Sequence, residues 1–572
     1  FFAGPNLLGA ISPSDKLNCV LIGCGGRGLQ AHLPAIAGEN VLGIVDVNEK
    51  RHEVVRQTLK GKGHDPEKLQ AFTDYRQMFD KIGKQIDAVF IATPNHHHAL
   101  PAMIAMQLGK NVYCEKPVCH DIAEARKLRD MARQSKVTTQ MGNQGHCEEG
   151  YRVLCEYVWA GAIGKVTETH SWTDRANGGS GPRPPSKPVP AGFHWEEWIG
   201  PAPYRDYHDD LQPHEWHGWY DFGNGSIGNM GCHVLDGVHW ALKLGHPTSI
   251  EVEEMRGGSE ERYPTGSRIR WDFPARGEMA AAKVYWYEGL KKNATRDADG
   301  MLKTAKGDAR NVPPLIGQLL KQYPEEEFDT NGTLYVGEKG IIYTGCYGEK
   351  MHIVPREKMK DTPVPAKTLP RHKSVFADFI EACRAGKTDT ATRFDYSTRL
   401  TEFTLLGNLA QHAGPGKKVE WDGENMRVTN IPELNAWVRR EYRPMAPTYD
   451  ITQSYVFNYD RGPHFASPPP PIADGPCKEF LGRKVRSRIG ISAGLLLNSK
   501  WLIGYARRGF DILTYKTVRS AHRPCYPPPN WVFVEEGGSA EGPVYVTSQW
   551  PEDATQISSA VCFGMPSMAP EV

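Results

Sequence analysis

Three glycines near the start of the chain have the spacing G-x-G-x-x-G. Gly23, Gly25 and Gly28 follow the apolar run Val20-Leu21-Ile22 and precede a helical run over 29–37. Lacking a Cβ, the first glycine permits a tight turn, the second lets a pyrophosphate approach the backbone, and the third lets helix and strand pack closely. Gly26 and Arg27 complete a loop whose N–H groups would face an anion. On its own, this pattern is equally typical of a plain turn.

An acidic residue strengthens the interpretation that this loop binds a dinucleotide. Asp46 ends the second predicted strand, 18 residues after Gly28, where a carboxylate would accept hydrogen bonds from a ribose diol. Its negative charge would repel a 2′-phosphate, which favours NAD as the cofactor. Lys50 and Arg51 follow closely enough that NADP stays open.

Two further loops follow later strands, at the edge where open α/β sheets bind ligands. One holds Thr93, Pro94, Asn95 and His98, and the other is Glu115-Lys116-Pro117. A lysine before proline is held extended and the bond can be cis, so Lys116 is a candidate for aiming into a cleft. For an arbitrary Lys-Pro pair, a solvated lysine at a turn is the better interpretation. Three consecutive histidines, 96–98, do not converge on one ion, so we predict no metal site.

The residues from 17 to 147 read as a dinucleotide-binding domain. Short apolar runs alternate with amphipathic helical runs there, which is typical of a parallel α/β sheet. We predict helices over 98–108 and 122–134. The predicted strands are 18–22, 41–46, 88–92, 111–114 and 138–141.

From Gly164 the pattern changes to long alternating runs, which predict a sheet with one covered face. These runs are 165–175, 249–256, 269–273 and 279–287, followed by predicted helices over 374–383 and 396–409. The Pro/Gly-rich loop 178–191 and the polar insert 291–331 interrupt the sheet. Loops of this length are often functional lids.

An aromatic and imidazole cluster lies between these loops. Its faces and ring nitrogens suit a carbohydrate site, although each aromatic taken singly is more often part of a core. The cluster comprises Trp195, Trp198, Tyr204, Tyr207, His208, His214, Trp216, His217, Trp219 and Tyr220. The helix that follows opens near Ser226 and carries Asn229, His233 and Asp236, at spacings that place successive members on neighbouring surface.

Three segments resemble the Gfo/Idh/MocA oxidoreductases: GCGGRG, ATPNHHHALPAMIAMQLGKNVYCEKP and GNMGCHVLD. The resemblance covers about residues 15–440. It implies an N-terminal Rossmann domain and, over 148–447, an α/β domain with a large, open, mostly antiparallel sheet. The implied reaction is hydride transfer between NAD(P) and a carbinol carbon of a sugar, inositol or related polyol.

The resemblance also assigns a catalytic group, at Lys116, Asn229 and His233. His233 would be the general base and Lys116 would stabilise the developing alkoxide. The family has Asp where this chain has Asn229, which cannot ionise. We expect substrate contacts from Asn143, Arg175, Trp195, Trp216 and Asp236.

The last 125 residues have a different character. A Pro-rich linker over 448–476 precedes a segment, 477–572, that resembles the start of dihydroorotate dehydrogenase-like flavoproteins. There the Ala493-Gly494 turn and Lys516-Thr517 would contact FMN. A (β/α)8 barrel takes about 250 residues, so we expect an incomplete TIM-barrel fragment that does not hold FMN.

Composition limits the classes of binding partner that we expect. The chain has 572 residues, with 68 Lys and Arg against 67 Asp and Glu, so no global field favours nucleic acid or an anionic membrane. No stretch has the roughly 20 apolar residues of a membrane span. An open-faced sheet with a wide apolar face needs covering, so we expect a homo-oligomer, dimer or tetramer.

The leader, residues 1–16, begins FFAGPNLLGAISPS, which is apolar, small-residue-rich and uncharged. It resembles the end of an export signal, which indicates a periplasmic or exported protein, with a disordered leader on a cytoplasmic protein as the alternative.

Two further functions stay open beside the dehydrogenase. One is an NAD-dependent redox glycosidase of the same fold, and the other is a non-catalytic, cofactor-bound sugar sensor. The sequence leaves the sugar, its stereochemistry and the direction of the reaction undetermined.

Overall fold

The computed structural model describes residues 16–211, 214–289 and 310–443, and short strands between 478 and 561. The chain divides into two compact units, 1–440 and 441–572. The predicted linker 448–476 and all of the predicted leader except Lys16 lie outside the described residues.

The first unit begins with a six-stranded parallel sheet of order β3-β2-β1-β4-β5-β6. This is the order of a Rossmann fold. The strands are β1 (Asn18–Ile22), β2 (Asn40–Val45), β3 (Gln70–Phe72), β4 (Ala88–Ile91), β5 (Asn111–Cys114) and β6 (Thr139–Met141). The five predicted strands are confirmed to within one residue at each end. The prediction missed β3, because three residues are too few to show a period.

Alternation along β1 explains why helices cover both faces of this sheet. Val20 and Ile22 face one core, and Cys19 and Leu21 face the other. The first core includes side chains of α3 (Tyr75–Ile82), α4 (Ala99–Gln107) and α5 (Ile122–Ser135). The second includes side chains of α1 (Leu33–Ile36), α2 (Lys50–Lys60) and α11 (Val375–Arg384).

A nine-stranded sheet forms the second part of this unit, in the order β13-β12-β11-β7-β10-β9-β8-β14-β15. Only β7 and β10 pair in parallel, so the predicted mostly antiparallel sheet is confirmed. Its strands are β7 (Val166–Thr173), β8 (Ser249–Arg256), β9 (Gly266–Phe273), β10 (Ala282–Gly289), β11 (Gly332–Gly337), β12 (Gly340–Gly345), β13 (His352–Val354), β14 (Lys418–Asp422) and β15 (Arg427–Val428).

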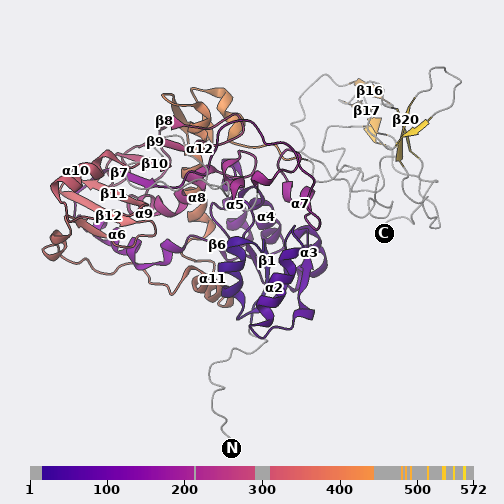
Figure 1. Cartoon of the computed structure of the whole chain (residues 1–572), viewed down its shortest axis with the longest axis horizontal. Helices are drawn as coiled ribbons and strands as arrows, with labels where there is room; N and C mark the ends of the chain where they lie inside the picture. Colours follow the sequence, from indigo (N-terminus) through magenta and orange to yellow (C-terminus); the bar gives the residue numbers. More distant parts are fainter. Residues whose placement is uncertain are drawn as a thin grey trace, which may run out of the picture. The chain divides into compact units, whose positions relative to one another are not determined.

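One long helix, α12 (Phe394–Ala413), connects the two sheets. It packs against α5 and β6 of the Rossmann part, and against β8 and α8 (Gly225–Val234) of the second part (Figure 1). Most of its residues are buried. The two parts therefore share a continuous core, to which α6 (Glu149–Trp159) and α9 (Asp236–Ala241) also contribute.

The outer face of β8 and β9 carries charges. Arg270 pairs with Glu251 and Glu253, with N–O distances of 2.8 Å, and Arg268 pairs with Glu253 at 2.7 Å. Alternate residues of β9, such as Ile269 and Trp271, are fully buried on the inner side. The expected homo-oligomer rested on a wide apolar face of this sheet, and β8 and β9 do not have such a face. The dimer or tetramer stays a prediction.

The predicted lid over 291–331 contains a packed helix. α10 (Pro314–Gln322) buries Ile316 and Leu319 against a cluster that includes Trp172 and Tyr343 of the nine-stranded sheet. The described part of this insert is therefore a cover of the sheet, because its apolar side chains are fixed there. Residues 290–309 lie outside the described residues.

In the second unit, the structure describes seven short strands in three small sheets. They are β16 (Lys478–Phe480), β17 (Arg483–Val485), β18 (Gly490–Ile491), β19 (Ile512–Leu513), β20 (Trp531–Glu535), β21 (Tyr545–Thr547) and β22 (Ser558–Val561). β18 and β19 are parallel, whereas β20 pairs antiparallel with both β21 and β22. A TIM barrel is all parallel, so the incomplete barrel is not supported. Residues 493, 494, 516 and 517 lie outside the described residues.

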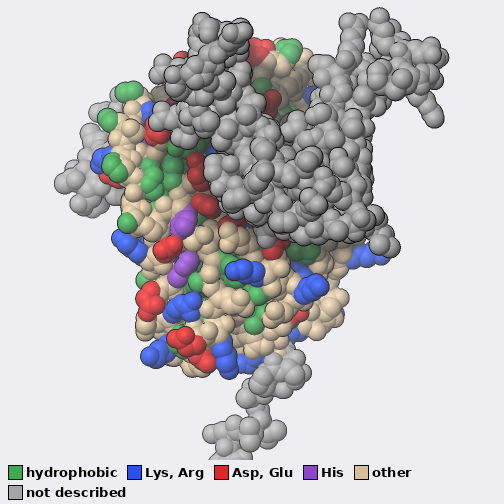
Figure 2. All heavy atoms as spheres, turned by 90° about the vertical axis from the view of Figure 1, so that its right-hand side faces the viewer, with side chains coloured by type: hydrophobic (Ala, Val, Ile, Leu, Met, Phe, Trp, Pro, Cys, Tyr) green, Lys and Arg blue, Asp and Glu red, His purple; other side chains and the backbone are tan. Residues whose placement is uncertain are grey.

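Within the described ranges, no helix is long and apolar enough to cross a membrane. Figure 2 shows one face, on which Lys and Arg side chains are interspersed with Asp and Glu over the exposed part of the Rossmann domain. This mixture agrees with the net charge of +1.

Candidate active site

The glycine loop has the steric properties of a pyrophosphate cradle. Gly23 has φ +91°, and a Cβ there would lie 2.6 Å from the Ala92 carbonyl oxygen. A Cβ on Gly28 would overlap the carbonyl oxygen of Gly23. At Gly25 the nearest atom would be 4.0 Å away, so its open side leaves the backbone accessible to a ligand. Gly26 is equally open, at φ +30°.

Asp46 is fixed beside this loop at the end of β2. Its Oδ2 accepts a hydrogen bond from the Cys24 N–H at 2.7 Å, and its Oδ1 accepts one from the Asn48 N–H at 2.8 Å. Burial raises the pKa of the Asp46 carboxyl, and the two backbone hydrogen bonds oppose that shift. The acid and the glycine loop thus form one preorganised edge of the sheet.

The loop after β4 offers unsatisfied polar atoms. Thr93 Oγ1 and Asn95 Oδ1 are buried and have no hydrogen-bond partner in the described protein. Buried polar groups are normally paired, so these two atoms fit a bound ligand. Pro94 lies between them and precedes the short helix Asn95–His97. Together with the glycine cradle and Asp46, they fit a dinucleotide.

The three adjacent histidines bind backbone carbonyls. His96 Nε2 and His97 Nε2 lie 2.8 and 2.9 Å from the Trp198 carbonyl oxygen. His98 lies 2.8 Å from the Thr93 carbonyl oxygen and 2.6 Å from that of Pro117. These contacts tie the β4 loop to two other segments, and burial lowers the pKa of His97 to about 4.

Glu115 anchors the loop after β5 to the glycine loop. Its Oε1 lies 2.8 Å from His32 Nε2 and 3.2 Å from Arg27 Nε. Burial alone would raise the pKa of Glu115, but the hydrogen bond from His32 and the charges of His32 and Arg27 lower it to about 2. Glu115 is therefore a carboxylate that orients Arg27. The Lys116–Pro117 bond that follows is cis.

Lys116 and Asn229 are in direct contact. The Lys116 ammonium donates to the Asn229 carbonyl oxygen at 2.7 Å and to Asn229 Oδ1 at 3.1 Å. Asn229 Nδ2 donates in turn to Asn177 Oδ1 at 2.9 Å. Burial lowers the pKa of Lys116, with the neighbouring Glu115 charge opposing the shift. The contact therefore brings the Lys116 ammonium of the Rossmann domain against helix α8.

His233 has a defined proton arrangement. Its Nδ1 lies 3.0 Å from Asn143 Oδ1. An amide oxygen only accepts, so Nδ1 carries the proton and Nε2 of the neutral ring keeps the lone pair. Burial and the Lys116 charge hold the pKa of His233 well below its usual value, so the ring is neutral near pH 7. Asn143 Nδ2 is buried without a partner, which leaves a donor for a ligand.

Small residues bring α8 to its place. A Cβ on Gly231 would lie 2.9 Å from Thr404 Cγ2 of α12, so glycine there lets the two helices approach closely. Gly225, at φ +60°, lies at the start of α8 against Tyr263. With Asn229 and His233 one turn apart on this helix, both reach the same region.

Two predicted substrate residues make their polar contacts within the protein. Asp236 is fully buried, with Tyr396 OH donating to it at 2.5 Å and His146 Nδ1 3.0 Å away, so its oxygens are occupied. Trp195 donates its indole N–H to the Arg205 carbonyl oxygen at 2.8 Å and stacks on Trp198, as part of a small aromatic core. Arg175 is exposed.

Trp216 has a position more suitable for contacting a substrate than Trp195 has. It is half-buried and stacks on the buried His217 ring at a centroid distance of 3.7 Å. Its short helix, Glu215–Gly218, packs against α8. His217 Nδ1 has no hydrogen-bond partner among the residues that the structure describes, and burial together with the Lys116 charge lowers the pKa of His217. His217 thus joins the site as a neutral imidazole.

Sequence reasoning missed three neighbours of the catalytic group: Asn177, His217 as an individual site residue, and Tyr347. Tyr347 packs edge-on against His233 at 5.0 Å. It follows β12, more than 110 residues beyond His233, with no motif to mark it. Only the aromatic cluster carried a signal, and it did not single out His217.

These features define an NAD-binding Rossmann domain joined to an α/β domain. Residues 17–143 match the family described as "Oxidoreductase family, NAD-binding Rossmann fold", and residues 163–270 match "Oxidoreductase family, C-terminal alpha/beta domain". Both family models describe domains of the Gfo/Idh/MocA oxidoreductases, and each is matched by this chain over the range given.

Curated relatives match parts of the chain. Levoglucosan dehydrogenase of Pseudarthrobacter phenanthrenivorans is 24% identical over 165 residues, covering 29% of this chain and 34% of that protein. The NADP-dependent D-xylose 1-dehydrogenase of Hypocrea jecorina is 44% identical over 84 residues, covering 15% and 22%. Dihydroorotate dehydrogenase of Dictyostelium discoideum is 34% identical over 141 residues, covering 22% and 37%. The matched parts of the chain thus span between 22% and 37% of the length of these relatives.

Solved structures match much of the chain at low identity and with TM-scores below 0.5. Aldose-aldose oxidoreductase from Caulobacter crescentus is 14% identical with a TM-score of 0.46, covering 71% of this chain and all of that chain. Levoglucosan dehydrogenase in complex with NADH is 17% identical with a TM-score of 0.44, covering 71% and 98%.

Proposed function

We propose that this protein is an NAD-dependent oxidoreductase that transfers hydride between the nicotinamide and a carbinol carbon of a sugar, inositol or related polyol. One observation carries the proposal: a neutral histidine with a fixed Nε2 lone pair lies with a half-buried lysine at the ligand-binding edge of an NAD-binding domain. Oxidation of an alcohol needs a base for the hydroxyl proton and a cation for the alkoxide.

The cofactor would be held by the glycine loop, Asp46 and the β4 loop. Gly25 leaves room for the pyrophosphate, Asp46 suits the ribose diol, and Thr93 and Asn95 offer their unpaired buried atoms. Bound NAD would supply the hydride acceptor. Because Asp46 stands where a 2′-phosphate would lie, we favour NAD over NADP.

The proton moves through residues of both domains. His233 Nε2 accepts the hydroxyl proton, while Asn143 holds Nδ1 and so fixes which nitrogen faces the substrate. The Lys116 ammonium stabilises the negative charge that develops on oxygen. Asn229 orients Lys116 through two hydrogen bonds without adding a charge.

Mass spectrometry of the purified protein for bound nucleotide, followed by a sugar and polyol panel monitored at the NADH absorbance, tests this function. We expect NADH formation that Lys116→Ala and His233→Ala each reduce about 100-fold or more. His64→Ala is the control and should retain the rate, because it removes a half-buried side chain whose Nε2 lies 2.8 Å from the Ala37 carbonyl oxygen, away from the catalytic group. A folded protein that binds no nucleotide would contradict the proposal.

A redox glycosidase is the second candidate, and the uncharged Asn229 beside Lys116 favours it. Transient oxidation of a sugar acidifies the neighbouring C–H, so that a glycosidic substituent can be eliminated without net redox change. Cleavage of an aryl glycoside that needs NAD but releases no NADH would support this candidate. Net NADH release from free sugars would favour the dehydrogenase.

A further inference from the structure

Helices α5 and α12 are joined by a ladder of charged side chains. At one end, Arg126 binds Glu402 through Nε at 3.0 Å and Nη2 at 2.6 Å. At the other end, Arg133 Nε binds Asp395 Oδ1 at 2.7 Å. The residue numbers rise along α5 as their partners' numbers fall along α12, so the two helices run antiparallel at this contact.

The middle rung of this ladder places two arginines opposite each other. Arg129 lies between Arg126 and Arg133 on α5, at helical spacings of three and four residues. Arg399 lies between Asp395 and Glu402 on α12, at spacings of four and three. Side chains at these spacings share a helix face, so Arg129 and Arg399 lie on the two faces that the outer ion pairs join. The Arg399 charge acts on Arg129 across this contact.

The described structure provides no acid for this rung. Arg129 Nε is buried without a hydrogen-bond partner. Glu402 is the carboxylate whose charge most opposes the lowered pKa of Arg129, and its oxygens are already bound by Arg126 and by His246 at 3.2 Å. Burial and the charges of Arg126, Arg399 and Arg133 lower the pKa of Arg129, with Glu402 opposing. The rung is therefore short of negative charge.

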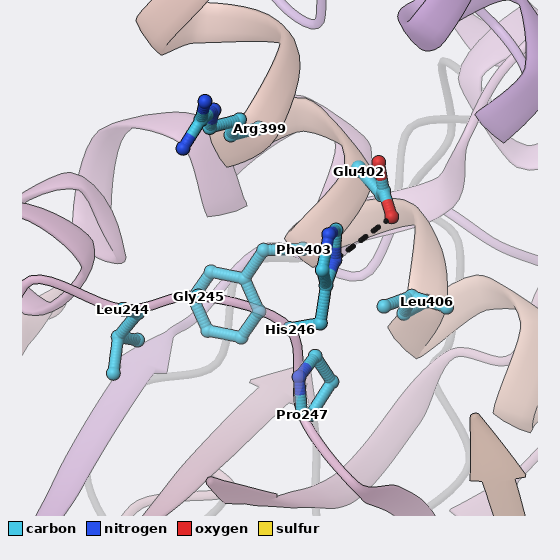
Figure 3. Close-up of a pocket in the computed structure, with 8 residues that line it drawn as sticks. All are labelled: Leu244, Gly245, His246, Pro247, Arg399, Glu402, Phe403 and Leu406. Atoms are coloured by element: carbon cyan, nitrogen blue, oxygen red, sulfur yellow. Dashed lines mark ion pairs between the residues drawn. The ribbon is translucent and has the colours of Figure 1, made fainter. Parts of the chain in front are cut away.

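A small cavity opens beside the rung. It measures about 100 Å³ and lies between α12 and the segment 244–247 (Figure 3). Arg399, Glu402 and Phe403 line it from α12, and His246 faces Glu402 across it (Figure 3). Arg399 is exposed, so a small ion reaches the rung from solvent.

We propose that Arg129 and Arg399 bind a phosphate-sized oxyanion, which supplies the missing negative charge of the middle rung. The planar guanidinium group matches phosphate oxygens with paired hydrogen bonds, and two such groups suit a dianion. The site uses none of Lys116, Asn229 or His233, so it is separate from the proposed active site. A bound oxyanion would lock α12 to α5, which are the helices that join the two domains.

Thermal unfolding of the full chain tests the proposal with inorganic phosphate as the probe. Sodium phosphate is compared with sodium chloride at equal ionic strength, which cancels general screening. We expect phosphate to raise Tm by about 2–4 °C above the chloride value. Glycerol 3-phosphate is the second arm: an equal rise shows that the site accepts a phosphate ester, and a smaller rise shows that it prefers the free ion.

Variants of the rung make the test specific. Arg129→Gln and Arg399→Gln should each abolish the phosphate effect, whereas Arg427→Gln, which removes an exposed arginine paired with Asp422, should keep it. Arg399→Glu should raise Tm in chloride, because it gives Arg129 an acidic partner, and should also remove the phosphate effect. An equal Tm in phosphate and chloride, or a phosphate effect that persists in Arg399→Gln, would overturn the proposal.

Discussion

His233 Nδ1 lies 3.0 Å from Asn143 Oδ1, and the two residues come from different domains. Asn143 follows β6 of the Rossmann domain, and His233 lies on α8. The proton position on the proposed base is therefore set by how the two domains pack. The imidazole of His233 therefore keeps a single orientation as long as the packing between the two domains is intact.

Asn143→Ala should lower kcat about 10-fold, because a ring without its Nδ1 acceptor spends time with the proton on Nε2. Initial rates of NADH formation, with KM measured in parallel, check this. Asn143→Asp restores an acceptor and should recover much of kcat. If Asn143→Ala raised KM and left kcat unchanged, Asn143 would bind substrate rather than position His233.

Asn229→Asp tests the departure from the family pattern. A carboxylate 3.1 Å from the Lys116 ammonium would form an ion pair and would also raise the pKa of the nearby His233. In the native protein that pKa lies well below 6.5, so kcat/KM should stay constant as the pH falls from 8 to 6.5. In Asn229→Asp, the acidic limb of the pH profile should move to higher pH. Asn229→Ala, which adds no charge, is the control and should leave the limb in place.

Glu115 should make the fold sensitive to acid. Its pKa is about 2 in the folded protein against 4.5 in the unfolded chain, so its stabilising contribution is complete above pH 4.5 and is lost as the pH falls toward 2. The shift corresponds to roughly 3 kcal/mol at most. Urea unfolding of the native protein and Glu115→Gln at pH 7 and pH 3 checks this. The stability difference should shrink at pH 3, and a difference independent of pH would contradict the assignment.

Local chemistry explains which parts of the fold the sequence predicts. The sequence predicts the strands β1 and β5 with their ends correct, because each is a short apolar run that begins at an asparagine and stops before a glycine or a glutamate. The glycine loop follows from steric rules that act within six residues. β3 and α10 were missed, because one is too short for a period and the other lies in a polar insert.

Contacts between residues that are distant in the sequence determine the features that could not be predicted. Asp46 and Lys116 could be placed because both end predicted strands of one sheet. Nothing in the sequence shows that Asn143 accepts from His233, 90 residues away, or that Asp236 turns toward His146. The opposed Arg129 and Arg399 depend on the register of two helices some 270 residues apart, which only the folded structure sets.

Two glycines of the cradle should respond differently to the same substitution. A Cβ on Gly28 would overlap the Gly23 carbonyl oxygen, so Gly28→Ala should destabilise the Rossmann domain by several °C in Tm. A Cβ on Gly25 would have no protein atom nearer than 4.0 Å, so Gly25→Ala should keep the native Tm. It should nevertheless weaken NAD binding about 10-fold or more, because the methyl group would occupy the space left for the pyrophosphate. Calorimetric titration with NAD, together with thermal unfolding, separates the two effects. Unchanged NAD affinity in Gly25→Ala would show that the pyrophosphate does not approach this side of the loop.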